Sequence, residues 1–367
     1  MSRTRSRGTP RTEAQGERMD GYGHMGRLAA SAAAGAVLLL AGCFRPPGPA
    51  PAPGSGPGDD RARQPRTAPH SSTPFWVNPH GTAARQAAAL RARGRTGEAA
   101  LIEEKIAAQP VAEWIGAKAP RAETARLTRA AARENRDALL VLYNIPHRDC
   151  GQYSKGGAPD GAAYRRWIAE VAAGIGDRPA AVILEPDAVP HIVDGCTPPV
   201  HHQERYGLLA EAVARLKALP RTRVYLDAGN PRWITDPGRL TGPLRRAGIG
   251  QADGFALNTA NYRTTAENRD YGRTLSRLLG GGKTFVIDTS RNGNGPLPGS
   301  GDQALSWCNP PGRALGEPPT TRTGDELVDA YLWIKRPGES DGTCKGGPPA
   351  GRWWTDYALD LARNADW

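Results

Sequence analysis

Short apolar runs alternate with longer segments of helical periodicity through the chain after residue 72. The apolar runs predict strands at 75–78, 138–143, 181–184, 223–226, 254–257, 284–287 and 330–334. The periodic segments predict helices at 83–115 (with a break at 94–97), 164–175, 206–219, 267–279 and 353–364. Such alternation is typical of a parallel sheet covered by helices, so the pattern predicts an α/β barrel of seven strands rather than a full eight.

The segment AVILEPDAVP, residues 181–190, places a carboxylic acid directly after one of these strands. The strand stops at Glu185-Pro186, because proline has no N–H for the ladder and restricts the residue before it. Asp187 therefore follows the carboxyl end of a strand, where α/β barrels carry their chemistry. Apolar neighbours disfavour its charged form, which suits a general acid, although a helix N-cap or a surface Asp is an alternative interpretation.

Acidic or amide residues follow most of the other predicted strands as well. These strand-end residues are Asp149, Asp187, Asp227, Asn258, Asp288 and the segment 335–341. The carboxyl ends of parallel strands share one rim, so these groups are expected to converge, and close carboxylates raise one another's pKa. No Ser-His-Asp order and no Cys-His pair competes for the chemistry.

Aromatic residues are mainly Trp and Tyr, nineteen against four Phe. Tyr143, Trp233, Trp307 and Trp333 flank the predicted rim, where such rings suit stacking on sugars. Trp114 and Trp167 are interpreted instead as core residues. The residues alone therefore predict a carboxylate-dependent glycosidase.

The N-terminal part of the chain predicts export. Residues 1–43 end in an apolar run and in Leu40-Ala41-Gly42-Cys43, which resembles the lipobox of bacterial lipoproteins, in which the Cys is acylated. An ordinary secretory signal with an incidental Cys43 is the alternative. The Pro/Gly-rich composition of residues 44–72 predicts a disordered linker, and we expect 73–367 to form one domain. We expect the protein on the extracellular side of the cell membrane, held by the lipid, or released to the medium.

Charge and cysteine content restrict the partners. The formal net charge is +11, of which the domain keeps about +6 without a basic stripe, so nucleic acid is not an expected partner. Removing Cys43 leaves four cysteines, and an even count in an exported chain predicts two disulfides with three possible pairings. No metal-ligand spacing is present, so we expect no metal or cofactor. We also expect the protein to be a monomer.

Seven motifs together resemble glycoside hydrolase family 6. They are YNIPHRDC (143–150), LEPDAV (184–189), YLDAG (225–229), GFALNTANYRTT (254–265), FVIDTSRNGNGP (285–296), WCNPPGRALG (307–316) and AYLWIKRPGESDGTC (330–344). The resemblance implies a distorted seven-stranded parallel β/α barrel, with a cleft across the strand carboxyl ends and no metal. It also implies the disulfides Cys150–Cys196 and Cys308–Cys344.

The resemblance further implies roles for single residues. Asp187 matches the general acid and Asp149 the carboxylate that raises the pKa of this acid and relays a proton from water. Asp341 matches a disputed candidate for the base, and Tyr143 the ring beneath the distorted sugar. The predicted substrate-binding residues are Arg148, Asp227, Trp233, Asn258, Trp307, Lys335 and Glu339.

Two positions depart from the family pattern. Lys155 stands where many members have a water-holding Ser, and Asn230 stands where they have His. The short segment 307–330 favours an open cleft and therefore endo action on β-1,4-glucan or cello-oligosaccharides. An inverting endo-β-1,4-glucanase is thus predicted, with a non-catalytic or weakly active β-glucan-binding lipoprotein, or a cellobiohydrolase, as the alternatives.

Overall fold

The sheet of the domain has seven parallel strands in sequential order. The computed structural model describes residues 73–299 and 306–367, so the predictions for residues 1–72, including Cys43, lie outside the described residues. The strands are β1 (Glu113–Ile115), β2 (Ala138–Leu142), β3 (Ala180–Leu184), β4 (Thr222–Asp227), β5 (Gly254–Leu257), β6 (Thr284–Asp288) and β7 (Val328–Leu332). Beyond them, the N–H of Ala112 donates to the carbonyl of Trp333 at 2.9 Å, in an isolated parallel bridge. The sheet is therefore a curled, distorted barrel, as predicted.

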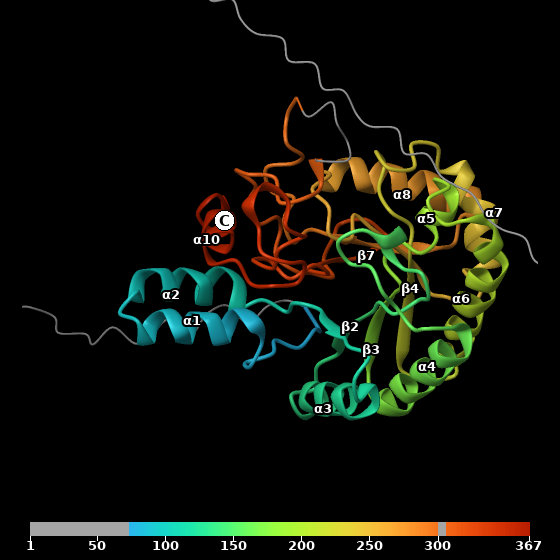
Figure 1. Ribbon diagram of the computed structural model, residues 1–367, viewed down its shortest axis with the longest axis horizontal. Coiled ribbons are helices and arrows are strands. Elements are labelled where there is room, and N and C mark those ends of the chain that lie inside the picture. Colours follow the sequence, from blue (N-terminus) through green and yellow to red (C-terminus); the bar gives the residue numbers. More distant parts are fainter. Residues whose placement is uncertain (1–72, 300–305) are drawn as a thin grey trace, which may run out of the picture. The chain divides into compact units, whose positions relative to one another are not determined.

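Helices follow most of the strands and cover the outside of the sheet (Figure 1). They are α1 (Thr82–Ala92), α2 (Thr96–Ile102), α3 (Pro120–Arg133), α4 (Gly161–Ile175), α5 (Pro190–Val193), α6 (His202–Lys217), α7 (Gly238–Arg246), α8 (Thr265–Leu279) and α10 (Thr355–Arg363). Helices α3, α4 and α6 lie in a row beside β2–β4, whereas α10 packs against α2 at the other side. In the described parts of the chain, no helix is long and apolar enough to cross a membrane.

The predicted elements before β2 are partly wrong. The strand predicted at 75–78 is absent: in this segment only Phe75 pairs with another residue, in one isolated bridge with Asp137. The helix predicted over 83–115 is too long, since α2 passes into a π-helical turn at Glu103–Ala107 and the chain then forms β1. A strand of three residues is too short for its periodicity to be recognised.

Three of the described α-helices, α3, α5 and α7, were not predicted, and α7 shows one reason. It contains Pro243 in its interior, a residue that normally ends a helix because it lacks an N–H donor. Leu240 and Leu244 of the same helix are fully buried in the main apolar cluster, so tertiary packing outweighs this preference.

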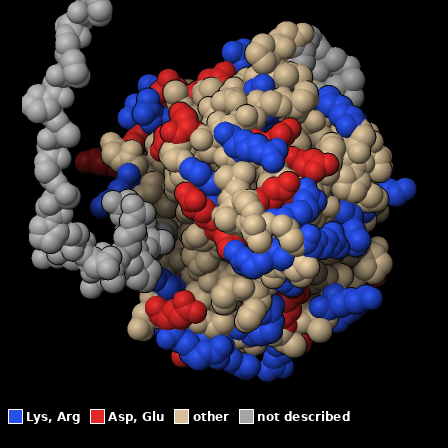
Figure 2. Space-filling model, turned by 90° about the vertical axis from the view of Figure 1, so that its left-hand side faces the viewer, with Lys and Arg blue, Asp and Glu red and all other residues tan. Residues whose placement is uncertain are grey.

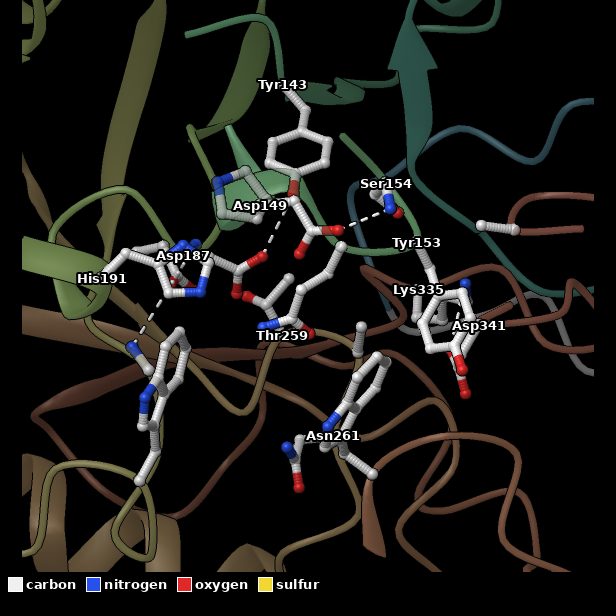
Figure 3. A pocket seen from close by; sticks show the side chains of 18 of the residues that line it. Tyr143, Asp149, Tyr153, Ser154, Asp187, His191, Thr259, Asn261, Lys335 and Asp341 are labelled. Atoms are coloured by element: carbon white, nitrogen blue, oxygen red, sulfur yellow. Dashed lines mark hydrogen bonds and ion pairs between the residues drawn. The ribbon is translucent and has the colours of Figure 1, made fainter. Parts of the chain in front are cut away.

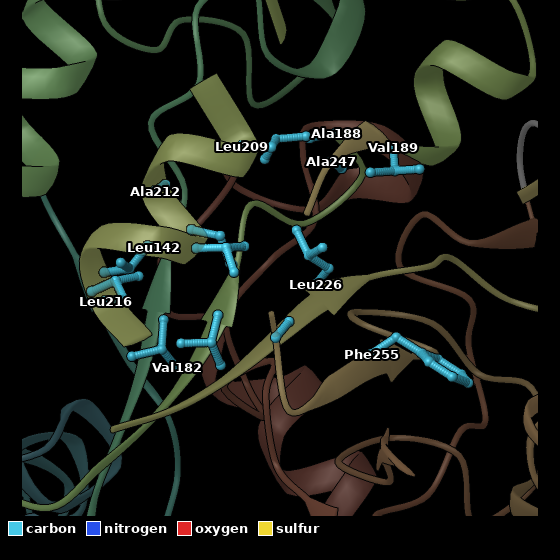
Figure 4. Packing of buried hydrophobic residues seen from close by; sticks show 14 of the residues in the cluster. Leu142, Val182, Ala188, Val189, Leu209, Ala212, Leu216, Leu226, Ala247 and Phe255 are labelled. Atoms are coloured by element: carbon cyan, nitrogen blue, oxygen red, sulfur yellow. The ribbon is translucent and has the colours of Figure 1, made fainter. Parts of the chain in front are cut away.

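Alternate strand residues form two separate apolar layers. One layer has no helical residue and lies inside the curled sheet; it includes Leu139, Val141, Ala181, Ile183, Tyr225, Ala256 and Val286. The other layer joins the outer strand face to the helices, as in the packing of Leu142 and Val182 near Ala212 and Leu216 of α6 (Figure 4). Each fully buried Leu, Ile or Val contributes about 1.5–3 kcal/mol, so these layers hold the strand ends in fixed positions.

Candidate active site

A cavity of about 620 Å³ lies at the carboxyl ends of the strands (Figure 3). The predicted site residues that line it are Tyr143, Arg148, Asp149, Asp187, Asp227, Trp233, Trp307, Lys335, Glu339 and Asp341. Asn258 is not among the lining residues. Its buried side-chain amide donates to the carbonyls of Arg263 (3.1 Å) and Asp288 (2.8 Å), and so holds the loop after β5. The structure thus brings ten of the eleven predicted residues together, and they come from loops after different strands.

Asp187 lines this cavity and lies in a strained turn. The backbone φ angles of Glu185 and Asp187 are +49° and +69°, a region that non-glycine residues adopt rarely and mostly at functional sites. The Tyr143 hydroxyl donates to Asp187 Oδ2 at 3.3 Å, and the Asp187 N–H donates to Asp227 Oδ2 at 3.0 Å. Burial, and then the charge of Asp149, raise the pKa of Asp187 to about 7. The carboxyl group can therefore hold a proton near neutral pH.

Asp149 is placed by the loop after β2. Its carboxylate accepts a hydrogen bond from the Ser154 N–H, and burial raises its pKa. The neighbouring Arg148 guanidinium lies 4.7 Å from the centre of the Tyr143 ring and donates to the Ser154 carbonyl at 2.8 Å. The disulfide Cys150–Cys196 ties this loop to the segment after α5, which confirms the predicted pairing.

Two further carboxyl groups lie beside Asp187. Asp227 is fully buried, and burial followed by the charge of Asp187 raises its pKa to about 7. Glu185, which the sequence did not single out, accepts hydrogen bonds from the N–H groups of Asn144 and Ile145, each at 2.9 Å. Burial raises the pKa of Glu185 to about 7. Its place in the Glu-Pro-Asp step, two residues before the acid, was the available signal.

Asp341 has the opposite electrostatic environment. Its Oδ2 lies 2.9 Å from Arg291 Nη1, and its Oδ1 lies 3.2 Å from Lys335 Nζ. Burial opposes ionisation of Asp341, but the two cations outweigh it and hold its pKa below the usual value. Arg291 is fully buried and was not predicted as part of the site. Asp341 thus stays ionised at a lower pH than an ordinary carboxyl group does.

Aromatic rings line the cavity on several sides. Trp233 is held by the Asn230 side chain, which accepts its N–H at 3.1 Å, and its indole donates to Asp194 at 2.8 Å. The interpretation of Trp114 as a core residue is wrong, because it lines the cavity and meets the Tyr143 ring edge-on at 5.6 Å. Trp333, predicted at the rim, is fully buried in the apolar cluster with α1, α2 and α10. The side chain of residue 333 points away from the rim because of its strand alternation.

The second predicted disulfide, Cys308–Cys344, is also present, beside Asp341. Among the described residues, Cys150, His191 and Cys196 bring potential metal-ligand atoms within 4.8 Å of one another. Both sulfur atoms are engaged in the disulfide, so they do not form a metal site in this state. Lys155 and Asn230, the two departures from the family pattern, both line the cavity.

A half-buried acid with a raised pKa, a second carboxylate close by and aromatic rings around a cavity at the strand ends together define a glycoside hydrolase. The sequence model of Glycosyl hydrolases family 6 matches residues 70–365, and the chain belongs to this family.

Similar proteins include three bacterial endoglucanases. Endoglucanase A of Cellulomonas fimi is 45% identical over 303 residues, which are 82% of this chain and 63% of that protein, so the chain spans less than two thirds of its length. Endoglucanase 1 of Streptomyces halstedii is 44% identical over 297 residues, 78% of this chain and 88% of that protein. The structure of the endoglucanase Cel6 from Mycobacterium tuberculosis, solved with methyl-cellobiosyl-4-deoxy-4-thio-β-D-cellobioside, matches with a TM-score of 0.73 and 45% identity, covering 80% of this chain and 98% of that chain.

Proposed function

We propose that the protein is an inverting endo-β-1,4-glucanase that acts on β-1,4-glucan or cello-oligosaccharides, with Asp187 as the general acid. The observation that carries this proposal is the Asp187 carboxyl group, half-buried in the wall of the cavity with its pKa raised to about 7. The names of the similar proteins, and the cello-oligosaccharide analogue bound to one of them, support the substrate class.

Protonated Asp187 gives its proton to the glycosidic oxygen as the bond to the anomeric carbon breaks. Water attacks that carbon from the opposite face, which inverts its configuration. The Tyr143 hydroxyl, whose pKa burial and the Asp187 charge raise well above its usual value, stays protonated and hydrogen-bonded to the carboxylate that is left. The Asp227 carboxylate, which accepts the Asp187 N–H, fixes the acid's backbone.

Asp149 is the better acceptor for the proton of the attacking water. A general base is most effective when its pKa lies near the working pH. The pKa of Asp149 is raised, whereas that of Asp341 is lowered by Arg291 and Lys335. We therefore assign proton uptake to Asp149, through water, and assign to Asp341 the fixing of Lys335 as a hydrogen-bond donor to the sugar.

The test compares two readouts on a soluble, substituted β-1,4-glucan. An endo enzyme cuts inside chains, so viscosity should fall steeply while few reducing ends have appeared. A slow fall in viscosity with abundant reducing sugar would favour the cellobiohydrolase alternative. Binding of the glucan without new reducing ends would favour the non-catalytic alternative, to which Lys155 in the cavity gives some support.

Export and lipid attachment at Cys43 are part of the proposal. The Leu-Ala-Gly-Cys sequence and the Pro/Gly-rich segment that follows support tethering of the protein outside the cell membrane. Lys and Arg are interspersed with Asp and Glu on the face in Figure 2, in keeping with a neutral polysaccharide as the partner rather than nucleic acid. Mass spectrometry of the mature N-terminus tests the lipid directly, and a mature chain without diacylglyceryl-cysteine would contradict it.

A further inference from the structure

An additional aromatic ring lies at the edge of the cavity. Tyr153 belongs to the loop after β2 that also carries Asp149, and it lines the cavity (Figure 3). Its side chain is 47% exposed, whereas most large apolar side chains in the described parts of the chain are buried. An exposed ring beside a cavity is typical of a surface that binds a ligand.

Tyr153 is held in place on one face. A Cβ atom added to Gly342 would lie 2.5 Å from Tyr153 Cγ and 2.6 Å from Cδ1, so the ring lies directly on the Gly342 backbone. Only glycine permits this approach. Gly342 belongs to the loop after β7 and directly follows Asp341, so the ring spans from one carboxylate-bearing loop to another.

Trp307 supports the same ring from the side. The two ring centroids are 6.1 Å apart and the ring planes meet at 63°, the edge-to-face geometry that aromatic pairs prefer. Trp307 also lines the cavity. Tyr153 and Trp307 therefore form an aromatic corner, two inclined rings in contact at the lining of the cavity.

We propose that this corner, Tyr153 with Trp307, binds one glucopyranose unit of the substrate, with the free face of Tyr153 stacked on the C–H face of the sugar. In β-linked glucose the ring hydroxyls are equatorial, so both sugar faces present C–H groups to an aromatic ring. An axial hydroxyl, as at C2 of mannose, would be pressed against the ring without a hydrogen-bond partner, which is unfavourable. Tyr153 is therefore a residue that selects all-equatorial sugar units. The inference rests on the proposed function and specifies its substrate recognition.

The experiment separates stacking from loop packing. Binding is measured by calorimetry with the full chain carrying Asp187→Ala, which prevents turnover of the ligand. The ligands are cellohexaose and β-1,4-mannohexaose. Four variants are added singly to this parent: Tyr153→Ala, Tyr153→Leu, Tyr153→Phe and, as a control, Val200→Ala. Val200 is 80% exposed and does not line the cavity.

Loss of the flat ring should weaken cellohexaose binding about 3- to 10-fold in both Tyr153→Ala and Tyr153→Leu. Leucine fills the space over Gly342 but offers no flat face. Tyr153→Phe and Val200→Ala should bind within about twofold of the parent, since stacking needs no hydroxyl. The parent should prefer cellohexaose to mannohexaose, and the Ala and Leu variants should lose part of this preference.

Cellohexaose binding by Tyr153→Leu as tight as that of the parent would overturn the inference, because the side chain would then serve only to pack the loop. An unchanged affinity in Tyr153→Ala would overturn it as well. Failure of the parent itself to bind cellohexaose would instead contradict the proposed function, and the two results are distinguishable because the first requires a parent that binds.

Discussion

The carboxyl groups of the site differ in pKa because their surroundings differ. Burial raises the pKa of Asp187 and of Asp227 to about 7, while Arg291 and Lys335 lower that of Asp341. The sequence could place these acids at strand ends, since each follows an apolar run. The sequence did not predict which of these acids has the higher pKa. That order depends on burial and on the ion pair with Arg291, which was not among the acidic and amide residues recognised at the strand ends.

Replacing Asp149 by Asn should move the pH profile of hydrolysis. Asp187 acts only while protonated, so the rate falls as pH rises through its pKa of about 7. The charge of Asp149 is one cause of that raised value, so in Asp149→Asn the fall should occur at a lower pH. The rate at the optimum should decrease about 10²-fold, because the proton acceptor is also lost. A profile measured in kcat/KM whose basic side does not move would contradict the coupling of the two acids.

Replacing Asp341 by Asn should destabilise the fold. The change leaves the fully buried Arg291 without its carboxylate, and removing one partner of a buried ion pair costs about 3–5 kcal/mol. Because the pKa of Asp341 is lowered in the folded protein, acid should destabilise the fold as well. The ionised carboxylate contributes its full stabilisation above the ordinary carboxyl pKa, and this stabilisation is lost as pH falls through the lowered pKa.

Urea unfolding followed by tryptophan fluorescence measures this loss. The control is Asp270→Asn, because the Asp270 side chain is 72% exposed and its contact with Arg269 is 4.0 Å long. That variant should change the free energy of unfolding by less than about 1 kcal/mol. Equal losses in the two variants would contradict the importance of the buried pair.

At the scale of elements, the loops after β2 and β3 carry both catalytic acids and are joined by Arg205 of α6. This buried guanidinium donates to the His147 carbonyl at 2.9 Å and to Thr197 Oγ1 at 2.6 Å. The sequence predicted α4, α6 and α8 from their periodicity, but it missed α3 although that helix has 14 residues. It predicted neither β1, which has only three residues, nor the contacts of Arg205, since a side chain that joins two loops leaves no local pattern.

Replacing Arg205 by Gln should lower kcat at least about 10-fold with a smaller change in KM, because small displacements of catalytic groups reduce the rate strongly. The Arg205 charge also lowers the pKa of Asp187, so its loss should move the basic side of the pH profile to higher pH, opposite to Asp149→Asn. Arg205→Lys should restore part of the rate. The control is Arg215→Gln on the exposed face of the same helix, and a profile like that of the control would contradict the positioning role.

At the scale of the whole molecule, the parallel sheet brings residues that are far apart in the sequence into one site. The acids and aromatic residues lie between residues 114 and 341, yet sequential strand order and a common direction bring them to one rim. The convergence of these residues on one rim could be predicted from the strand ends alone. The sequence did not predict which aromatic rings face the cavity, because this depends on the alternation of side chains along each strand: Trp114 faces the cavity and Trp333 does not.

The stereochemistry of hydrolysis tests the central claim most directly. If Asp187 protonates the leaving oxygen while water attacks from the opposite face, the first sugar released from a β-1,4-glucan has the α configuration. Proton NMR of a short cello-oligosaccharide, recorded within minutes of adding the full chain, distinguishes the two anomers before they interconvert. We predict that the α-anomer signal appears first. Initial appearance of the β anomer would mean a retaining mechanism and would contradict the assignment of Asp187 as the acid of an inverting pair.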